Sequence, residues 1–276
     1  MNAKPLRILG TVLNYLALIL AAIIYLLPIY LLFITGLKGF AEVNLQTMWD
    51  LPSSINFENF SAAFEKLWPF LKNSLRLTIP AALFSSALGS MNGYVLSKWK
   101  FKGSDIIFTL ILFGMFIPYQ SILIPLVRFM QTIHLYGGIP GLILVHVIYG
   151  IPITTLIFRN YYANIPTEVL QASRIDGADF LGIYRWIIFP LSAPGFVVVI
   201  IWQFTSIWNE FLFAIILTNP QAWPITVALN NLAGSQIVEW NVQMAGALLA
   251  ALPTLLIYIF LGRYFIRGLM AGAMKG

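Results

Sequence analysis

The chain has 276 residues, of which 59% are hydrophobic and only 9% are charged. Soluble domains carry about 25% charged residues, so this composition excludes an ordinary soluble protein and indicates a membrane protein. The formal net charge is +6, but the Lys and Arg residues stand in short clusters beside apolar runs. That pattern indicates membrane topology rather than nucleic-acid binding. The absence of cysteine excludes disulfides, thiol catalysis and cysteine metal sites.

Six apolar segments are each long enough for a spanning helix, which needs about 20 residues. The expected spans are residues 9–35, 74–97, 104–127, 139–159, 195–218 and 244–266. The first is interpreted as a retained helix rather than a cleaved signal peptide, because its apolar run is long enough to span. Four prolines are expected to kink their spans, namely Pro118, Pro125, Pro152 and Pro253. The predicted fold is an all-α polytopic membrane protein, with residues 1–276 forming one transmembrane domain.

Residues 36–73, between the first two expected spans, are interpreted as a loop with short helices. Aromatic side chains recur over residues 51–75, where they suit a short interfacial helix that leads into the second span.

Basic residues divide unevenly between the two sides of these spans. With the amino terminus inside, eleven lie on the cytoplasmic side: Lys4, Arg7, Lys98, Lys100, Lys102, Arg159, Arg174, Arg185, Arg263, Arg267 and Lys275. Five lie on the other side: Lys38, Lys66, Lys72, Arg76 and Arg128. The positive-inside rule therefore predicts that both termini are cytoplasmic.

Residues 164–190, the coupling segment, separate the fourth and fifth expected spans and are rich in charge for this chain. Thr167 is suited to cap a short helix, which is expected to run to Ala178. Asp179 is expected to cap a second short helix, which Pro190 is expected to end. A solvated connector needs no such length, because most loops are far shorter. The segment is therefore interpreted as a structured element at the membrane surface.

The run from Ile165 to Ala178, together with Ile187–Leu191 and Pro194, closely resembles the EAA signature of ATP-binding-cassette (ABC) importers. Its form is similar to the permeases of the carbohydrate-uptake, maltose-type branch, and the chain looks like their second subunit. The resemblance implies an ABC type I importer fold, in which the first short helix is a cytoplasmic coupling helix that docks on an ATPase subunit. The ATPase-coupling residues that it implies are Glu168, Gln171, Ala172, Ser173, Asp176, Gly177, Ala178 and Pro190.

The chain departs from the signature where the family usually has Glu-Ala-Ala, because here Gln171, Ala172 and Ser173 follow one another. Gln171 lacks the negative charge, so an ion pair to the ATPase would become a neutral hydrogen bond. Ser173 and Gly177 lie on one face of the helix, where the side chains therefore stay small. Docking therefore stays the expectation.

Two polar residues in the fifth span, Asn209 and Glu210, are candidates for lining the translocation path. Glu210 can instead hydrogen-bond a neighbouring helix, and the sequence leaves this open. His146 in the fourth span has no second metal-type ligand at a suitable spacing, so a packed histidine is favoured and no metal site is expected.

The loop at residues 218–241 resembles the one that faces the substrate-binding protein in these importers. The resemblance implies contacts through Trp223, Pro224, Asn230 and Gly234. Membrane-interface anchoring is an equal alternative for the tryptophans Trp223 and Trp240.

The end of the chain, residues 262–276, is similar to the tail of the second permease subunit, which extends along the ATPase dimer. The resemblance implies ATPase contacts through Gly272, Ala273, Lys275 and Gly276.

No G-x-x-x-x-G-K-[ST] motif occurs in the chain, so ATP and Mg²⁺ are expected on a partner ATPase and no cofactor on this chain. Catalytic motifs such as G-x-S-x-G and H-E-x-x-H are also absent, which disfavours a membrane enzyme. A self-sufficient secondary transporter is the alternative, but the inverted repeats and buried charges typical of that class are not found.

The favoured function is the permease subunit of an ATP-driven sugar importer, which forms half of the pore. The resemblance implies a second permease subunit, two cytoplasmic ATPase subunits and an extracytoplasmic sugar-binding protein as partners. It places the chain in the lipid bilayer of a prokaryotic cytoplasmic membrane, as a multi-pass protein without a nucleic-acid partner.

Overall fold

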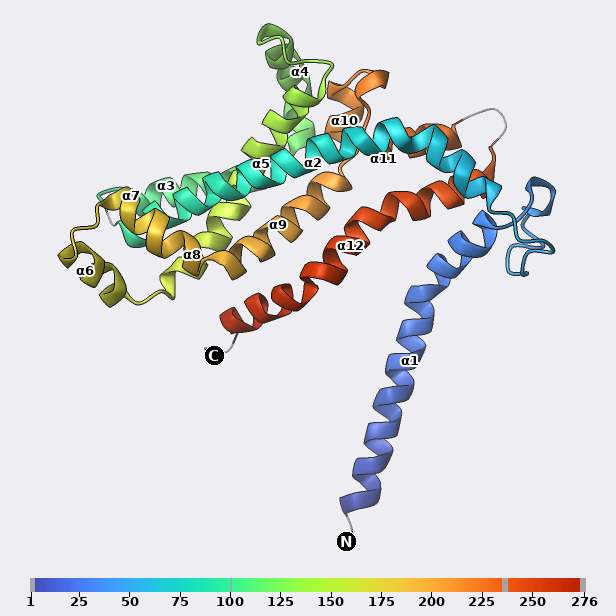
Figure 1. The fold of residues 1–276 in the computed structure, drawn as a ribbon, viewed down its shortest axis with the longest axis horizontal. Coiled ribbons are helices and arrows are strands. Elements are labelled where there is room, and N and C mark those ends of the chain that lie inside the picture. Colours follow the sequence, from blue (N-terminus) through green and yellow to red (C-terminus); the bar gives the residue numbers. More distant parts are fainter. Residues whose placement is uncertain (1–2, 100, 235–237, 274–276) are drawn as a thin grey trace. The chain divides into compact units, whose positions relative to one another are not determined.

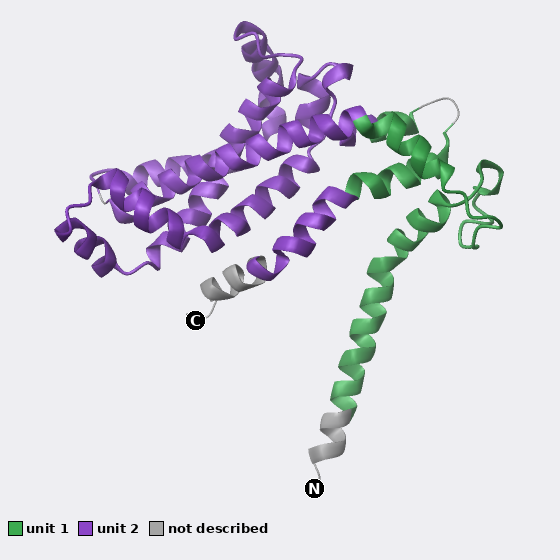
Figure 2. Ribbon diagram, in the orientation of Figure 1, with its two compact units in different colours: residues 1–68, 229–251 green, residues 69–228, 252–276 purple. Residues whose placement is uncertain are grey.

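The computed structural model describes residues 3–99, 101–234 and 238–273. These residues form helices joined by short connections, and an isolated bridge between Gly137 and Thr218 is the only strand-like pairing described among them. The chain separates into two compact units (Figure 2): one comprises residues 1–68 and 229–251, and the other comprises residues 69–228 and 252–276.

Four long helices dominate the chain (Figure 1): α1 (Ala3–Gly36), α2 (Glu58–Lys98), α5 (Ile139–Ala163) and α12 (Trp240–Ala273). Shorter elements lie between them: η1 (Phe40–Glu42), α3 (Ser104–Phe113), η2 (Gly114–Phe116), η3 (Tyr119–Ile122), α4 (Leu123–Thr132), α6 (Thr167–Ile175), α7 (Phe180–Ile183), the π-helix η4 (Tyr184–Ile188), α8 (Phe189–Leu191), α9 (Ala193–Trp208), α10 (Leu212–Leu217), η5 (Pro220–Ala222) and α11 (Ile225–Ala233). The predicted all-α class is confirmed.

Within the described residues, three helical stretches are long and apolar enough to cross a membrane alone: Leu9–Gly36, Ile139–Ala163 and Trp240–Tyr264. The number rises to five if each of two bent helix pairs counts as one span. The expected second span, 74–97, lies within α2 and is not among them. Serines, glycines and Asn92 lower the hydropathy of that stretch. The count of six spans therefore stays a prediction.

α2 differs from the expected loop, short interfacial helix and separate span. It is one helix of 41 residues, with Pro69 and Pro80 inside it. Tertiary packing along α2 outweighs the helix-breaking tendency of these prolines, as happens often in membrane helices.

The first unit is held together at the carboxyl end of α1. Asn59 donates hydrogen bonds to the carbonyl oxygens of Gly36 and Lys38, at 2.9 and 2.8 Å, and accepts one from Asn241 at 2.9 Å. These bonds satisfy carbonyl groups that a helix end leaves without partners. Ala63 and Ala245 are fully buried beside them.

The second unit is built around α5. Two glycines of α2, Gly89 and Gly93, allow α2 and α5 to come so close that there is no space for a side chain between their backbones. A Cβ atom on Gly89 would lie 2.1 Å from Thr154 Oγ1, and one on Gly93 would lie 2.8 Å from the backbone nitrogen of Arg159. Small residues at such contacts are the usual way in which membrane helices pack closely.

The expected third span, 104–127, is divided into two helical stretches, and the kink expected at Pro118 is confirmed. Ser104–Phe116 and Tyr119–Thr132 meet at a bend of 87°. Pro118 has no backbone N–H and pushes Ile117 into an extended conformation, so the helix stops there. Pro125 does not interrupt α4, because it lies in the first turn, where its missing N–H has no intrahelical partner.

The expected fifth span, 195–218, is also divided. α9 ends at Trp208 and α10 begins at Leu212. A second bend, of 75°, separates Phe180–Leu191 from α9.

Candidate functional site

The coupling segment forms two short helical stretches at one end of the second unit (Figure 1). The first, α6, begins after Pro166, and no side chain caps it, so the predicted N-cap role of Thr167 is wrong. α6 ends at Ile175 rather than at the predicted Ala178. Gly177 has φ +85°, a left-handed conformation that glycine adopts without strain.

The turn after α6 is a Schellman motif. The backbone N–H of Ala178 donates to the carbonyl of Ser173 at 2.9 Å, and that of Gly177 donates to the carbonyl of Arg174 at 3.1 Å. Glycine at this position is the common way to end a helix. The chain therefore reverses sharply at Gly177.

The second stretch begins at Asp179, whose carboxylate accepts a hydrogen bond from the backbone N–H of Gly182 at 2.7 Å. The predicted cap is confirmed. The predicted end at Pro190 is wrong, because Pro190 lies inside α8 and helical structure continues to Leu191. The π-helix η4 precedes it, and a π-turn of this kind is often found at functional sites.

The start of the coupling segment is attached to the end of α2. Lys98 Nζ donates a hydrogen bond of 2.6 Å to the carbonyl oxygen of Ile165. Burial lowers the pKa of the Lys98 ammonium below its ordinary value, and the carboxylate of Glu168 partly opposes this lowering.

Two tyrosine hydroxyls hold the backbone of the second stretch. Tyr94 of α2 donates to the carbonyl of Phe180 at 3.2 Å, and Tyr161 of α5 donates to the carbonyl of Leu191 at 2.9 Å. The segment is thus bound along its length to both α2 and α5.

The aromatic ring of Trp99, just after α2, adds contacts from the same side. Its ring centroid lies 4.9 Å from that of Phe180, and the Arg174 guanidinium lies 4.5 Å above the ring. The guanidinium contact is a cation–π interaction between α6 and the end of α2.

The opposite surface of α6 is open. Five of the predicted coupling residues are exposed: Glu168, Gln171, Ala172, Asp176 and Gly177. Ala178 is half-buried, and Pro190 is exposed. Ser173 is only 6% exposed and donates to the carbonyl of Val169, so it lies on the inner side with Leu170.

Ile175 is 87% exposed at the end of α6, a residue that the sequence reasoning missed. Its place at the last position of the helix, two residues before the αL glycine Gly177, was the available signal. It adds an apolar group to a charged surface.

Glu210 and Asn209 lie at the break between α9 and α10. The Glu210 carboxylate accepts hydrogen bonds from the backbone N–H groups of Phe213 and Ala214, at 2.6 and 3.1 Å. It therefore caps α10, and its side chain is only 15% exposed. Asn209 is exposed and donates to the carbonyl of Thr205 at 2.9 Å.

His146 of α5 approaches the same carboxylate, with 3.6 Å between its Nε2 atom and the nearer oxygen. The side chain of His146 is 7% exposed, and its ring packs edge-on against that of Phe213. Within the described residues, no cluster of three metal-type ligands is formed.

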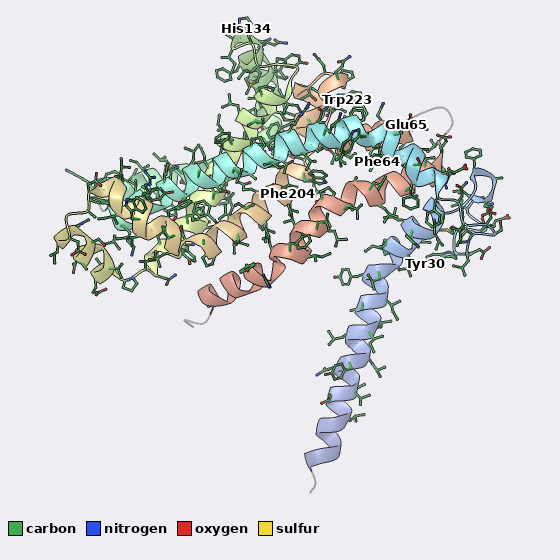
Figure 3. The ribbon with its side chains drawn as sticks, in the orientation of Figure 1. Tyr30, Phe64, Glu65, His134, Phe204 and Trp223 are labelled. Atoms are coloured by element: carbon green, nitrogen blue, oxygen red, sulfur yellow. The ribbon has the colours of Figure 1, made fainter. Side chains whose placement is uncertain are left out.

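The loop after α10 is held to the start of the expected second span. Asn73 Nδ2 donates to the carbonyl oxygens of Gln221 and Trp223, at 2.9 and 3.1 Å. Ser74 Oγ accepts from the backbone N–H of Ile225 at 2.8 Å and so caps α11. Trp223 lies half-buried in the link between η5 and α11 (Figure 3).

The other loop residues differ in exposure. Pro224 is buried, whereas Asn230 and Gly234 are exposed in the first unit. Of the predicted tail contacts, Gly272 and Ala273 form the end of α12. Lys275 and Gly276 lie outside the described residues.

The sequence of residues 85–270 matches the family of binding-protein-dependent transport system inner membrane components. A probable ABC transporter permease protein of Pyrococcus horikoshii is 49% identical, over 95% of this chain and 96% of its own length. The glucose import system permease protein GlcU of Saccharolobus solfataricus is 33% identical, over the full length of both chains.

The fold is also found in solved structures, one of which aligns over nearly the whole chain. It is a chain of a bacterial ABC transporter involved in the import of the acidic polysaccharide alginate. The TM-score is 0.80 with 22% sequence identity, over 96% of this chain and 99% of that chain.

Proposed function

Because the chain belongs to the binding-protein-dependent transport system inner membrane components, that is, to the permease subunits of ABC transporters, we propose that it carries a sugar. A relative of matching length is a glucose import permease, which supports the carbohydrate branch. The chain would form half of the translocation pore, with a second permease subunit supplying the other half.

One observation carries the mechanism: α6 is fastened on one side and open on the other. Lys98 binds the backbone in front of α6, and Arg174 stacks on Trp99 behind it. The open side presents the predicted docking residues and Ile175. A partner that binds this surface can therefore push or pull the segment without first unfolding it.

The partner that we propose for this surface is a cytoplasmic ATPase subunit, which would hold the Mg²⁺ and ATP. Closure of an ATPase dimer would move α6, and the attached ends of α2 and α5 would move with it. The resulting change would alternate access to the pore between the two sides of the membrane. Hydrolysis would then return the segment to its resting position.

We place the coupling segment and both termini on the cytoplasmic side of a prokaryotic cytoplasmic membrane, as the distribution of Lys and Arg indicates. The loop held by Asn73 and Ser74 would then face outward. It would receive an extracytoplasmic sugar-binding protein through Trp223. The exposed residue Asn230, in the first unit, is a proposed contact in its own right.

The test is purification of the tagged chain in mild detergent, followed by mass spectrometry of the proteins that remain bound. We expect an ATPase, a second permease and a sugar-binding protein, and proteoliposomes of this complex should take up sugar only with ATP. If the chain alone transports in vesicles that lack ATP, the proposal is wrong and a secondary transporter replaces it.

A further inference from the structure

The hydroxyl group of Ser90 joins three elements of the second unit. Its oxygen lies 2.6 Å from the hydroxyl oxygen of Tyr162, at the end of α5. It lies 2.8 Å from the hydroxyl oxygen of Tyr184, the first residue of the π-helix in the coupling segment. Ser90 itself belongs to α2. Both distances are typical of well-formed O–H···O hydrogen bonds.

These three hydroxyls lie where water has little access. Ser90 and Tyr162 are fully buried, and Tyr184 is half-buried. A serine oxygen can take part in both bonds at once, because it donates one proton and accepts through two lone pairs. Removal of the Ser90 oxygen would break both bonds at once: the buried Tyr162 hydroxyl would keep only its contact with Ser192, and the half-buried Tyr184 hydroxyl would lose its Ser90 partner.

Close packing on either side of Ser90 joins α2 and α5 rigidly. Gly89 and Gly93 flank it, and the space for a Cβ atom at each is filled by Thr154 and by Phe158 with its neighbour Arg159. Such backbone contact leaves no room for the two helices to slide independently.

The other hydrogen bonds that attach the segment to α2 and α5 end on its backbone. Lys98, Tyr94 and Tyr161 each donate to a backbone carbonyl. A hydrogen bond to a backbone carbonyl does not depend on which side chain the acceptor residue carries. The bond with Ser90, in contrast, requires the hydroxyl group of Tyr184. The π-helix that starts at Tyr184 sets its register, because the backbone N–H of Phe189 donates to the Tyr184 carbonyl, five residues back.

We propose that Ser90 is a positioning residue that transmits the movement of the coupling segment to α2 and α5. It would do so by holding Tyr184 and Tyr162 on one hydroxyl group. This role rests on the proposed function of the segment as the part that the ATPase moves. Ser90 would not touch the sugar or the nucleotide.

The experiment uses two spin labels in the full chain, in its purified complex. The chain has no cysteine, so cysteines introduced at Ile175 and Ile79 are labelled specifically. Both positions are exposed, at 87% and 48%. The first reports the coupling segment and the second reports the far part of α2, so the distance between them follows their relative movement.

In the parent chain, we expect one narrow distance distribution that ATP leaves unchanged, because the two parts move together. In S90A, we expect the distribution to broaden without nucleotide. Loss of both hydrogen bonds should raise the population in which the coupling segment is detached from α2 about tenfold. Addition of ATP should then shift the distance, since the segment moves without α2. Y184F, which removes only one bond, should show the same effect to a smaller extent.

Two variants serve as controls. Ser86→Ala removes a buried serine hydroxyl of the same helix that donates to the carbonyl of Ala82 in its own helix, so it should behave like the parent. Ser90→Thr keeps the hydroxyl and should restore the narrow distribution.

The proposal is overturned if S90A keeps a narrow distribution, or if S86A broadens it as much as S90A does. It is also overturned if ATP shifts the distance in the parent chain. The distribution without nucleotide does not depend on an ATPase. Its result therefore decides the role of Ser90 even if no ATPase copurifies and the proposed function fails.

Discussion

Lys98 Nζ lies 2.6 Å from the carbonyl oxygen of Ile165, which ties the last residue of α2 to the start of the coupling segment. The donor is a charged ammonium, and hydrogen bonds from charged groups are shorter and stronger than neutral ones. This contact lies two residues before α6, so it is placed to set the direction in which that helix leaves α5.

Replacement of Lys98 by Met should loosen the start of α6. The bond contributes about 1.5 kcal/mol, the low end for a charged donor because Lys98 is only half-buried. Hydrogen exchange of the amides in residues 167–175 should therefore become about tenfold faster. Lys102→Met, at an exposed lysine nearby, is the matched control. Equal exchange rates in both variants would show that the Lys98 contact does not hold the helix.

Replacement of Gly177 by Val should stop ATP-driven uptake while the chain still inserts and binds its second permease. Nothing lies within 4 Å of a Cβ atom at this position, so the obstacle in the chain itself is the φ of +85°. Holding a β-branched residue there costs about 2 kcal/mol, and the turn should shift.

Gly177→Asn is the matched variant, because asparagine tolerates the left-handed conformation better than other side chains. Uptake into proteoliposomes should be largely retained in this variant. Normal uptake by the Val variant would mean that the turn after α6 has no part in coupling.

Replacement of Glu210 by Ala should destabilise the protein by about 1–2 kcal/mol, the usual effect of losing an N-terminal helix cap. The backbone N–H groups of Phe213 and Ala214 would lose their acceptor at the break in the fifth span. Glu210→Gln keeps one amide oxygen as an acceptor and should cost less. Thermal unfolding in detergent measures both, with the exposed Glu65→Ala as the reference. If E210A and E65A unfold at the same temperature, Glu210 does not act as a cap.

Replacement of Gly89 by Ala should separate α2 from α5. The new Cβ would lie 2.4 Å from Thr154 Cβ and 2.8 Å from its backbone carbonyl carbon. Overpacking of this kind costs about 1–3 kcal/mol. Gly262→Ala, where nothing lies within 4 Å, should be neutral or slightly stabilising. The yield of monodisperse chain in detergent and its unfolding temperature distinguish the two, and equal values would contradict the close packing.

Local features of the coupling segment are readable from sequence. Asp179 is recognisable as a cap because its short side chain precedes an apolar run, and the structure confirms it. The end of α6 could also have been predicted, since glycine is common just past the last residue of a helix, where Gly177 lies. The predicted helix was too long because Gly177 was taken as part of a helix face made of small residues.

Long-range contacts are not readable in this way. Ser90 lies 72 residues from Tyr162 and 94 residues from Tyr184, and a serine in an apolar span gives no sign of its partner. Glu210 could be predicted as either pore-lining or hydrogen-bonded. The break in the fifth span accounts for the hydrogen bonds, because it leaves backbone N–H groups that need an acceptor, and a pore-lining role stays a prediction.

The extent of the bend at Pro118 was beyond sequence reasoning for a similar reason. Proline predicts an interruption, but α4 packs against α10 from the distant fifth span, and that packing sets where the second half points. The presence of Pro118 alone is compatible with a mild kink or with the bend of 87° that is found.

Whether α6 contacts the ATPase can be measured by photo-crosslinking from Ile175 in membranes that contain the assembled transporter. We expect a single major crosslink to the ATPase subunit from this position. The same crosslinker at the exposed residue Ile148 of α5 should give none to the ATPase. A crosslink from Ile175 only to lipid or to the second permease, with the ATPase present, would contradict the claim that α6 is where ATP hydrolysis acts on this chain.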